Sequence, residues 1–492
     1  MINLEKKKSV KANFLYNTVF QIFIYIIPLI TIPYVSRILG AEHIGQYSYA
    51  MSIVTYFTMF ATLGTGIHGQ RKIAYYRDDK SKLSEAFWNI LCFRLITSTA
   101  AILLYVAYLR LFAFPFTMLE LVVTLNIVDV AVDVSWFFQG LEEFKQTVIR
   151  GFAVKVIGLI CIFLFIRDAN DTWKYALILL GATILGSLSL WRYIPRLILK
   201  PKHVQPFHDI KDTILVFLPT IATQVYSVLD KSMISWITKS DYENGCYEQS
   251  EKIVRVLMIM VSSASTVMLP RIANLYSEKN YDEIKRYVYK GYRVVFMLSI
   301  PFMFGLISVA SVFMPLYLGS GYDMSVNLLI IFTWILVAEG MSSATGLAYL
   351  VPTKQQNAYT VSLVIAAVLN FCMNLYLIPR IGAYGSALSS IIAETMGSLI
   401  QVFYCVKTGQ LSIKQIFVPS WRYAVSGIIM FAALMFLKHW LTQGIVSLCI
   451  LVLTGVLVYV LMLIFLRDEL AMYGIKKFGD RVSKINKRSQ TH

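Results

Sequence analysis

Residues 444–466 read GIVSLCILVLTGVLVYVLMLIFL, with no charged side chain among them. A helix rises about 1.5 Å per residue, so this run is long enough to cross the roughly 30 Å hydrocarbon core of a bilayer. Comparable runs recur along the whole chain, which is 57% apolar and only 15% charged. Soluble proteins carry about 25% charged residues. The sequence therefore predicts an all-α integral membrane protein.

Apolar runs separated by polar connections predict about fourteen transmembrane helices. We place them at 13–36, 44–66, 84–108, 112–138, 147–167, 172–194, 213–237, 245–270, 288–313, 324–350, 356–378, 384–406, 422–441 and 444–466. An even number of helices puts both chain termini on the same side of the membrane.

The basic residues gather on one side of this predicted topology. The connections on the other side carry only Arg37, Arg110, Arg167, Lys174, Lys239, Arg380 and Lys438 of the chain's 45 Lys and Arg. Cytoplasmic loops of membrane proteins are enriched in Lys and Arg, so we expect both termini in the cytoplasm. The same bias accounts for most of the net charge of +17. We therefore expect membrane lipids, and no nucleic acid, as partners of the basic surface.

The two halves of the chain share short sequence patterns. Gly45-Gln-Tyr and Gly245-Cys-Tyr open the second and eighth predicted spans, and Gly186-Ser-Leu in span six matches Gly397-Ser-Leu in span twelve. Duplicated bundles are common in transporters. We expect two parallel six-helix lobes, related by a pseudo-two-fold axis along the membrane normal, followed by two extra helices. The expected divisions are an N-terminal lobe at 1–194, a cytoplasmic linker at 195–212, a C-terminal lobe at 213–406, and the extra helices with a basic tail at 407–492.

Four stretches carry a resemblance to a known family. They are PYVSRILG at 33–40, DVSWFFQGLE at 133–142, LDKSMI at 229–234 and NFCMNLYLIP at 370–379. With these stretches in this order, almost the whole chain resembles the polysaccharide repeat-unit flippases (Wzx type) of bacterial capsule and O-antigen pathways. These flippases belong to the multidrug/oligosaccharidyl-lipid/polysaccharide exporter superfamily.

The resemblance implies a function and a location. A flippase of this kind moves an undecaprenyl-pyrophosphate-linked oligosaccharide from the cytoplasmic to the outer leaflet of the bacterial cytoplasmic membrane, by alternating access of two lobes. It serves capsule, O-antigen or exopolysaccharide synthesis. The polymerase and glycosyltransferases of the same pathway are the implied protein partners.

Five cations fall inside predicted spans: Arg94, Lys155, Lys231, Lys252 and Arg255. A charge at the centre of a membrane helix costs about 2.5–3.5 kcal/mol on insertion scales and marks a candidate functional site. Because Lys and Arg bind phosphate oxygens through charge-assisted hydrogen bonds, we expect these side chains to line a lumen that receives the pyrophosphate.

The alternative for these cations is local charge pairing. Glu248 and Lys252, and likewise Glu251 and Arg255, are spaced i,i+4 on one helix. Asp230 adjoins Lys231, although neighbours in sequence point to different sides of a helix. Arg94 and Lys155 have no acidic residue within reach on their own helices. Their candidate partners on other helices are Asp129, Asp133 and Glu339.

Acidic residues and prolines add two further hypotheses. Asp129, Asp133, Asp230, Glu339 and Glu394 are candidates to bind a coupling Na⁺ or proton, or to neutralise a cation. Pro28, Pro33 and Pro219 lie in the spans that open the two halves, where kinks would suit gating. Trp136, Trp191 and Trp421 lie near predicted cytoplasmic span ends, as aromatic residues of the membrane interface do.

Three other functions remain open. A multidrug or cation antiporter of the same superfamily would need an acidic lumen. A flippase for the cell-wall lipid precursor would carry cations in its first two spans, where this chain has only Arg37 and His68, at the span ends. A membrane-embedded sugar polymerase or acyltransferase would need a large polar loop, and the external connections here are short. With no P-loop motif and no paired Cys/His spacing, we expect no enzymatic activity, metal or cofactor.

Overall fold

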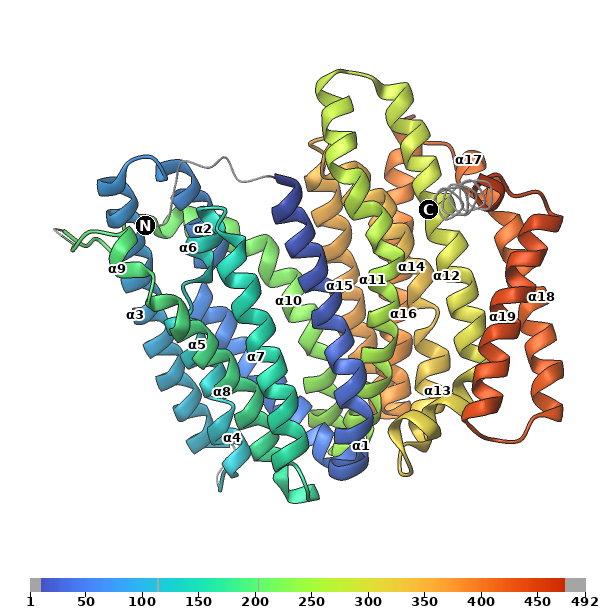
Figure 1. The fold of residues 1–492 in the computed structure, drawn as a ribbon, viewed down its shortest axis with the longest axis horizontal. Helices are drawn as coiled ribbons and strands as arrows, with labels where there is room; N and C mark the ends of the chain where they lie inside the picture. The colour runs from blue at the N-terminus through green and yellow to red at the C-terminus, as the bar shows by residue number, and fades with distance from the viewer. Residues whose placement is uncertain (1–9, 113–114, 202, 474–492) are drawn as a thin grey trace, which may run out of the picture. The chain divides into compact units, whose positions relative to one another are not determined.

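The computed structural model describes residues 10–112, 115–201 and 203–473, without the side chains of 10–26, 144–149, 215–216 and 218–227. Figure 1 shows that this part of the chain is built of helices, with no β-strand in it. Eleven helical stretches among the described residues are long and apolar enough to cross a membrane. The protein is therefore an all-helical, multi-pass membrane protein, as the sequence predicts.

The helices follow one another with short connections. Their bounds are α1 Val10–Thr62, α2 Thr65–Tyr76, α3 Lys80–Phe112, α4 Met118–Val122, α5 Leu125–Val132, α6 Ser135–Gly140, α7 Phe144–Phe165, η1 Ala169–Asp171, α8 Thr172–Trp191, α9 Ile194–Leu197, α10 Ile210–Thr238, α11 Asp241–Ser277, α12 Tyr281–Leu318, α13 Asp323–Phe332, α14 Ile335–Ser342, η2 Ser343–Leu350, α15 Gln356–Ile381, α16 Ala383–Lys407, α17 Ile413–Phe417, η3 Val418–Ser420, α18 Trp421–Trp440 and α19 Ile445–Phe465.

Each predicted span coincides with helical segments, but the segments are divided differently. The first two spans both lie in α1, which is broken at Gly40, where φ is 76° and ψ is 171°. Glycine adopts a positive φ without the steric penalty that a Cβ atom brings. The link between these spans is therefore a single residue.

The predicted continuous span 112–138 is interrupted. α5 ends where Asp133 takes an extended conformation (φ −73°, ψ 117°), and α6 begins at Ser135. The carboxylate of Asp133 accepts hydrogen bonds from the backbone N–H and the hydroxyl of Ser135, at 3.0 and 2.7 Å. Such local side-chain bonds compete with helical ones, which explains the break.

The predicted span 324–350 is also divided. It forms α13, α14 and then η2, a π-helical segment. Wide turns of this kind are frequent at functional sites. Glu339 lies in α14, one turn before the π-helix begins.

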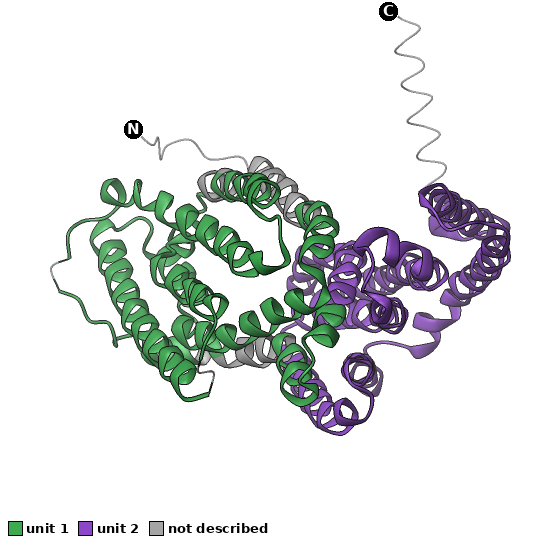
Figure 2. Cartoon of the chain, turned by 90° about the horizontal axis from the view of Figure 1, so that it is seen from below, with its two compact units in different colours: residues 1–248 green, residues 249–492 purple. Residues whose placement is uncertain are grey.

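The chain forms two compact units, Met1–Glu248 and Gln249–His492, which Figure 2 shows in different colours. In the first unit, α2, α3 and α6 pack around an aromatic core in which Phe87 stacks on Trp136 with ring centroids 5.6 Å apart. Trp136 is only 2% exposed. The prediction that Trp136 belongs to the membrane interface is therefore wrong, because the side chain packs inward against Gly69 of α2. Trp421, by contrast, is 50% exposed.

In the second unit, α15 and α16 pack along one another, and α18 and α19 pack against α12. Asn370 is fully buried and donates to the hydroxyl of Ser390 at 3.2 Å, which joins α15 to α16. Asn374 donates to Asn370 at 3.1 Å. These buried amides thus find partners both within α15 and on α16, in a setting without water.

Candidate functional site

An ionisable cluster lies where α10 and α11 meet α1. The ammonium of Lys231 is 2.5 Å from the carboxylate of Glu248, which also accepts a hydrogen bond from Ser48 at 3.0 Å. The hydroxyl of Tyr247 donates to Asp230 at 2.6 Å. Asp230 and Lys231 thus both bind side chains of α11, although they are neighbours in sequence. The buried charges are paired, as low-dielectric surroundings require.

The backbones of α1 and α11 come into direct contact beside this cluster. A Cβ atom on Gly45 would overlap the carbonyl oxygen of Asp241 and lie 2.9 Å from the nitrogen of Gly245. A Cβ atom on Gly245 would overlap the carbonyl oxygen of Ala41 and lie 3.0 Å from the nitrogen of Gly45. The contact is reciprocal, and only glycine permits it at either position.

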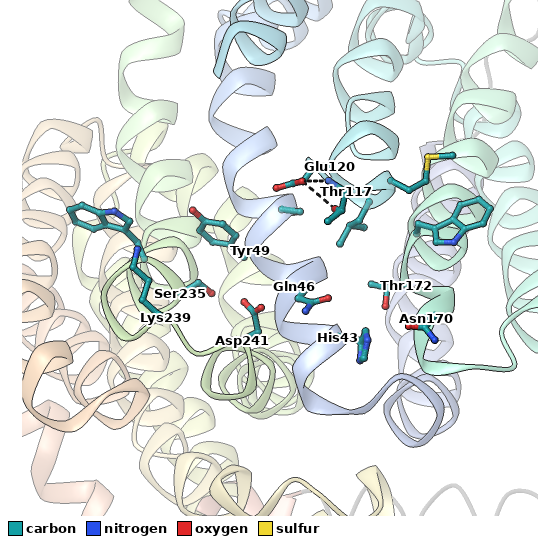
Figure 3. A pocket seen from close by; sticks show the side chains of 15 residues that line it. His43, Gln46, Tyr49, Thr117, Glu120, Asn170, Thr172, Ser235, Lys239 and Asp241 are labelled. Carbon is teal, nitrogen blue, oxygen red and sulfur yellow. Dashed lines mark hydrogen bonds between the residues drawn. The ribbon is translucent and has the colours of Figure 1, made fainter. Parts of the chain in front are cut away.

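A cavity of about 530 Å³ opens next to this contact. Figure 3 shows the side chains around it, which come from α1, α4, η1, α8, α10 and the start of α11. Among those that line the cavity are His43, Gln46, Tyr49, Glu120, Asn170, Trp173, Trp236, Lys239 and Asp241. The lining combines large aromatic rings with carboxylate, amide and imidazole groups. Aromatic faces pack against the C–H faces of sugar rings, while the polar groups can exchange hydrogen bonds with hydroxyls.

Arg94 is 5% exposed and lies against the end of α5. Its guanidinium donates to the carbonyl of Asp133 at 2.8 Å and lies 3.9 Å from the carboxylate of the same residue. Arg150 of α7 approaches that carboxylate to 3.8 Å. The sequence left three candidate partners open for Arg94, and the structure shows it beside Asp133. Asp129 accepts instead from Ser187 at 2.7 Å.

In the second unit, the i,i+4 pair predicted between Glu251 and Arg255 is confirmed, with a shortest separation of 2.6 Å. The side chain of Arg255 remains 53% exposed. Glu339 of α14 interacts electrostatically with both Arg255 and Glu251. Lys252 is half-buried on α11, and Glu394 is half-buried on α16, near Tyr359.

The remaining predicted site residues lie apart from these clusters. Lys155 is exposed on α7, and no carboxylate of the described residues is within ion-pair distance. Pro28 and Pro33 are half-buried in α1, and neither takes the backbone out of the helical region. The hydroxyl of Thr31 donates to the carbonyls of Ile27 and Pro28 at 3.3 Å. Pro219 belongs to the part of α10 whose side chains lie outside the described residues.

One polar cluster was not predicted from the sequence. Asp209, at the start of α10, binds Lys72 and lies 3.6 Å from His68, both of α2. Burial alone would raise the pKa of Asp209, but Lys72 and His68 together lower that pKa below its ordinary value. The i,i+4 spacing of His68 and Lys72 indicates that the two side chains share one face of α2. Their partner, Asp209, lies far along the chain and could not be found from that spacing.

Comparison with protein families gives two matches. The family described as "Polysaccharide biosynthesis protein" matches residues 10–276, and the family described as "Lipid II flippase MurJ" matches residues 152–457. A protein of Escherichia coli (strain K12) named "Putative O-antigen transporter" is 21% identical over 408 residues, which cover 81% of this chain and 97% of that protein.

Solved structures agree on the fold. A structure of the lipid II flippase MurJ in an inward closed conformation aligns with a TM-score of 0.76 and 17% identity, covering 92% of this chain and 99% of the other. An inward-facing multidrug resistance MATE family transporter aligns with a TM-score of 0.59 and 12% identity, over 83% of this chain and 95% of the other. The chain belongs to the polysaccharide biosynthesis protein family, as a Wzx-type member of the multidrug/oligosaccharidyl-lipid/polysaccharide exporter superfamily.

Proposed function

We propose that this protein flips lipid-linked oligosaccharides, with undecaprenyl pyrophosphate as the carrier, from the cytoplasmic to the outer leaflet of a bacterial cytoplasmic membrane. The observation that carries the proposal is the ionisable cluster of Asp230, Lys231 and Glu248 inside membrane helices. Ionisable residues inside membrane helices are costly, and they mark candidate binding and transport sites even where they are paired. The names of the relatives, an O-antigen transporter and a lipid II flippase, agree with this substrate class.

The proposal includes fourteen membrane helices in two six-helix lobes with both termini in the cytoplasm. Two glycines that match in the sequence repeat support the duplication. A Cβ atom on Gly186 of α8 would lie 2.5 Å from Val154 of α7, and one on Gly397 of α16 would lie 3.2 Å from Ala366 of α15. Both glycines thus allow close packing of the two helices in a hairpin.

The five cations would act in two ways. Lys155, Lys252 and Arg255 present their charges at least partly exposed and would contact the pyrophosphate directly. Arg94 and Lys231 are held by Asp133 and Glu248. An arriving pyrophosphate would compete with these carboxylates and so couple binding to movement of the helices.

The acidic residues would serve the return of the empty carrier. Glu339, beside the Arg255–Glu251 pair, and Glu394 would take up a proton or Na⁺, while Asp129, Asp133 and Asp230 keep structural partners. Among the pathway's proteins, glycosyltransferases supply the substrate and a polymerase consumes it.

Alternating access requires a contact that closes one side. The charge bias supports an outer position for the α1–α11 contact at Gly45 and Gly245, which would then be a closed outer gate. Pro28, Pro33 and Pro219 would let α1 and α10 bend as this gate opens. The neighbouring cavity, with its aromatic and polar lining, would receive sugar rings as they leave.

The direct test is translocation in liposomes. The purified protein is reconstituted with a labelled polyprenyl-pyrophosphate oligosaccharide, and movement between leaflets is measured for the wild type, Arg255→Gln and Lys155→Gln. Protein-dependent flipping that falls in both variants supports the function and the cations together. If the wild type moves no lipid-linked glycan from a panel of different head groups, the proposed function is wrong.

A further inference from the structure

A second cavity, of about 710 Å³, lies in the second unit at the beginning of α12. Four cations of that helix line it: Lys285, Arg286, Lys290 and Arg293. The opposite walls come from Gln415 and Pro419, around α17, and from Glu469, Leu470 and Tyr473, which follow α19. None of these residues belongs to the site described above.

The charges in this cavity are unbalanced. Four cations face two carboxylates, Asp282 and Glu469. Arg293 is 2.6 Å from Glu469, and this hydrogen bond and charge lower the pKa of Glu469. Lys285, Arg286 and Lys290 have no carboxylate within ion-pair distance in the described part of the chain. The cavity thus keeps an excess of positive charge that an anion would neutralise.

Hydrogen bonds hold the walls of the cavity in place. The hydroxyl of Tyr289 accepts from the backbone N–H of Ser412 at 2.9 Å, which fixes the segment before α17 to α12. Tyr423 donates to Asp468 at 3.0 Å, and the other oxygen of Asp468 accepts from the N–H groups of Leu470 and Ala471, each at 3.0 Å. The positions of Leu470 and Glu469 are therefore set by the fold, and the cavity does not depend on loosely held loops.

The cavity sits where membrane helices end. α12 continues from the basic residues into an apolar segment, Pro419 of the cavity lies just before α18, and Glu469 lies just after α19. Phe417, Val418, Trp421 and Tyr473 are exposed around it, at 40%, 54%, 50% and 62%. Aromatic and apolar side chains next to Lys and Arg are typical of the boundary between head groups and hydrocarbon.

We propose that this cavity binds the phosphate head group of an anionic membrane lipid, whose acyl chains lie along the exposed apolar side chains beside α17 and α18. Basic pockets between membrane helices bind such head groups, and a soluble anion would make no use of the apolar border. The binding is separate from the transport of the lipid-linked glycan, and it does not require that proposal to hold.

The test uses the full chain in detergent micelles, titrated with phosphatidylglycerol or cardiolipin and, in parallel, with phosphatidylcholine. Bound lipid is counted by native mass spectrometry, and the shift in Tm is followed. The pocket variant is Lys285→Gln/Arg286→Gln/Lys290→Gln. The matched control, Arg71→Gln/Lys80→Gln/Lys211→Gln, removes the same charges from exposed positions of the first unit.

We expect the wild type and the control to bind anionic lipid, and the pocket variant to bind it at least about tenfold more weakly, because each basic residue near an anionic surface strengthens association several-fold. Equal anionic-lipid binding by the pocket variant and the control would overturn the proposal. So would an equal Tm shift with inorganic phosphate or pyrophosphate alone, which would identify a soluble anion as the ligand. Because lipid binding is read without flipping, a failed flipping assay leaves this result intact.

Discussion

Gly45 of α1 and Gly245 of α11 pack against each other's helix with reciprocal geometry, each facing the carbonyl of the residue four positions before the other. The two glycines also open the matching patterns of the internal sequence repeat. The nitrogen of the Asn244 side chain donates to the carbonyl of Gly45 at 3.1 Å, next to this contact. The contact therefore joins two positions that the predicted repeat makes equivalent.

Gly45→Ala is expected to separate α1 from α11, because its Cβ atom would overlap the Asp241 carbonyl. Overpacking of this kind costs about 1–3 kcal/mol, so the melting temperature falls. Cys246, which is buried beside Gly245, then reacts faster with a maleimide in a variant that keeps only this cysteine. Gly181→Ala is the control, since a Cβ atom there meets nothing within 4 Å. Unchanged labelling and melting in Gly45→Ala would contradict the contact.

Removing one member of the Lys231–Glu248 pair is expected to destabilise the protein by about 3–5 kcal/mol, because the other charge is left buried and unpaired. The double variant Lys231→Met/Glu248→Gln should recover most of that loss. A thermal double-mutant cycle measures it. The double variant should still flip substrate poorly, since the cation is gone. Full flipping by the double variant would leave Lys231 with a structural role alone.

Substitutions of Arg94 and Arg255 are expected to affect stability and transport differently. Arg94→Gln removes the buried guanidinium that bonds the Asp133 carbonyl and lies against its carboxylate, so the melting temperature should fall. The side chain of Arg255 is 53% exposed, whereas Arg94 is buried. Arg255→Gln should therefore lower the melting temperature less than Arg94→Gln does, but flip more slowly per folded molecule. Equal melting temperatures for the two variants would argue against this division.

The Asp209 cluster predicts a dependence of stability on pH. Because the folded-state pKa of Asp209 is lowered, its contribution is fully present above the unfolded pKa of about 3.9. The contribution disappears as the pH falls through the folded value. Asp209→Asn should thus be less stable than the wild type at pH 7, and the two should converge in acid. Unfolding measured from pH 7 to about pH 1 checks this, since the loss of the contribution extends below the folded pKa. Curves that stay parallel over that whole range would contradict it.

The membrane potential is expected to drive the loaded step. An anionic head moving outward gains about 2.3 kcal/mol per charge for each 100 mV of inside-negative potential. In vesicles with a potassium gradient and valinomycin, the flipping rate should rise with that potential and fall when it is abolished. A flipping rate that does not respond to the potential would contradict this prediction and indicate that an ion gradient drives transport instead.

The apolar helices were predictable because a helix needs about 20 apolar residues to cross the hydrocarbon core, and such runs stand out in the sequence. The ion-pair partners of the charged residues were harder to predict. The i,i+4 rule found Glu251 and Arg255, which share a helix. It could not find Lys231 of α10 beside Glu248 of α11, because these residues lie on different helices. A choice between partners on different helices depends on packing that periodicity does not contain.

The break at Asp133 and the cavity in Figure 3 also depend on contacts that no sequence pattern predicts. Asp133 lies in an apolar run that reads as one helix, and only its bonds to Ser135 end α5. The cavity collects Tyr49, Glu120, Trp173 and Asp241 from separate elements. No spacing in the sequence connects them, so the cavity could be found only from the folded chain.

The one-residue link at Gly40 constrains how this chain can change length. Each residue added to or removed from a helix turns everything beyond it by about 100° around the helix axis. An insertion near Gly40 would therefore rotate Gly45 away from α11 and bring a side chain into the contact. Most connections between helices tolerate insertions and deletions, but we expect homologous chains, peptide tags and fusion junctions to leave this turn at its present length.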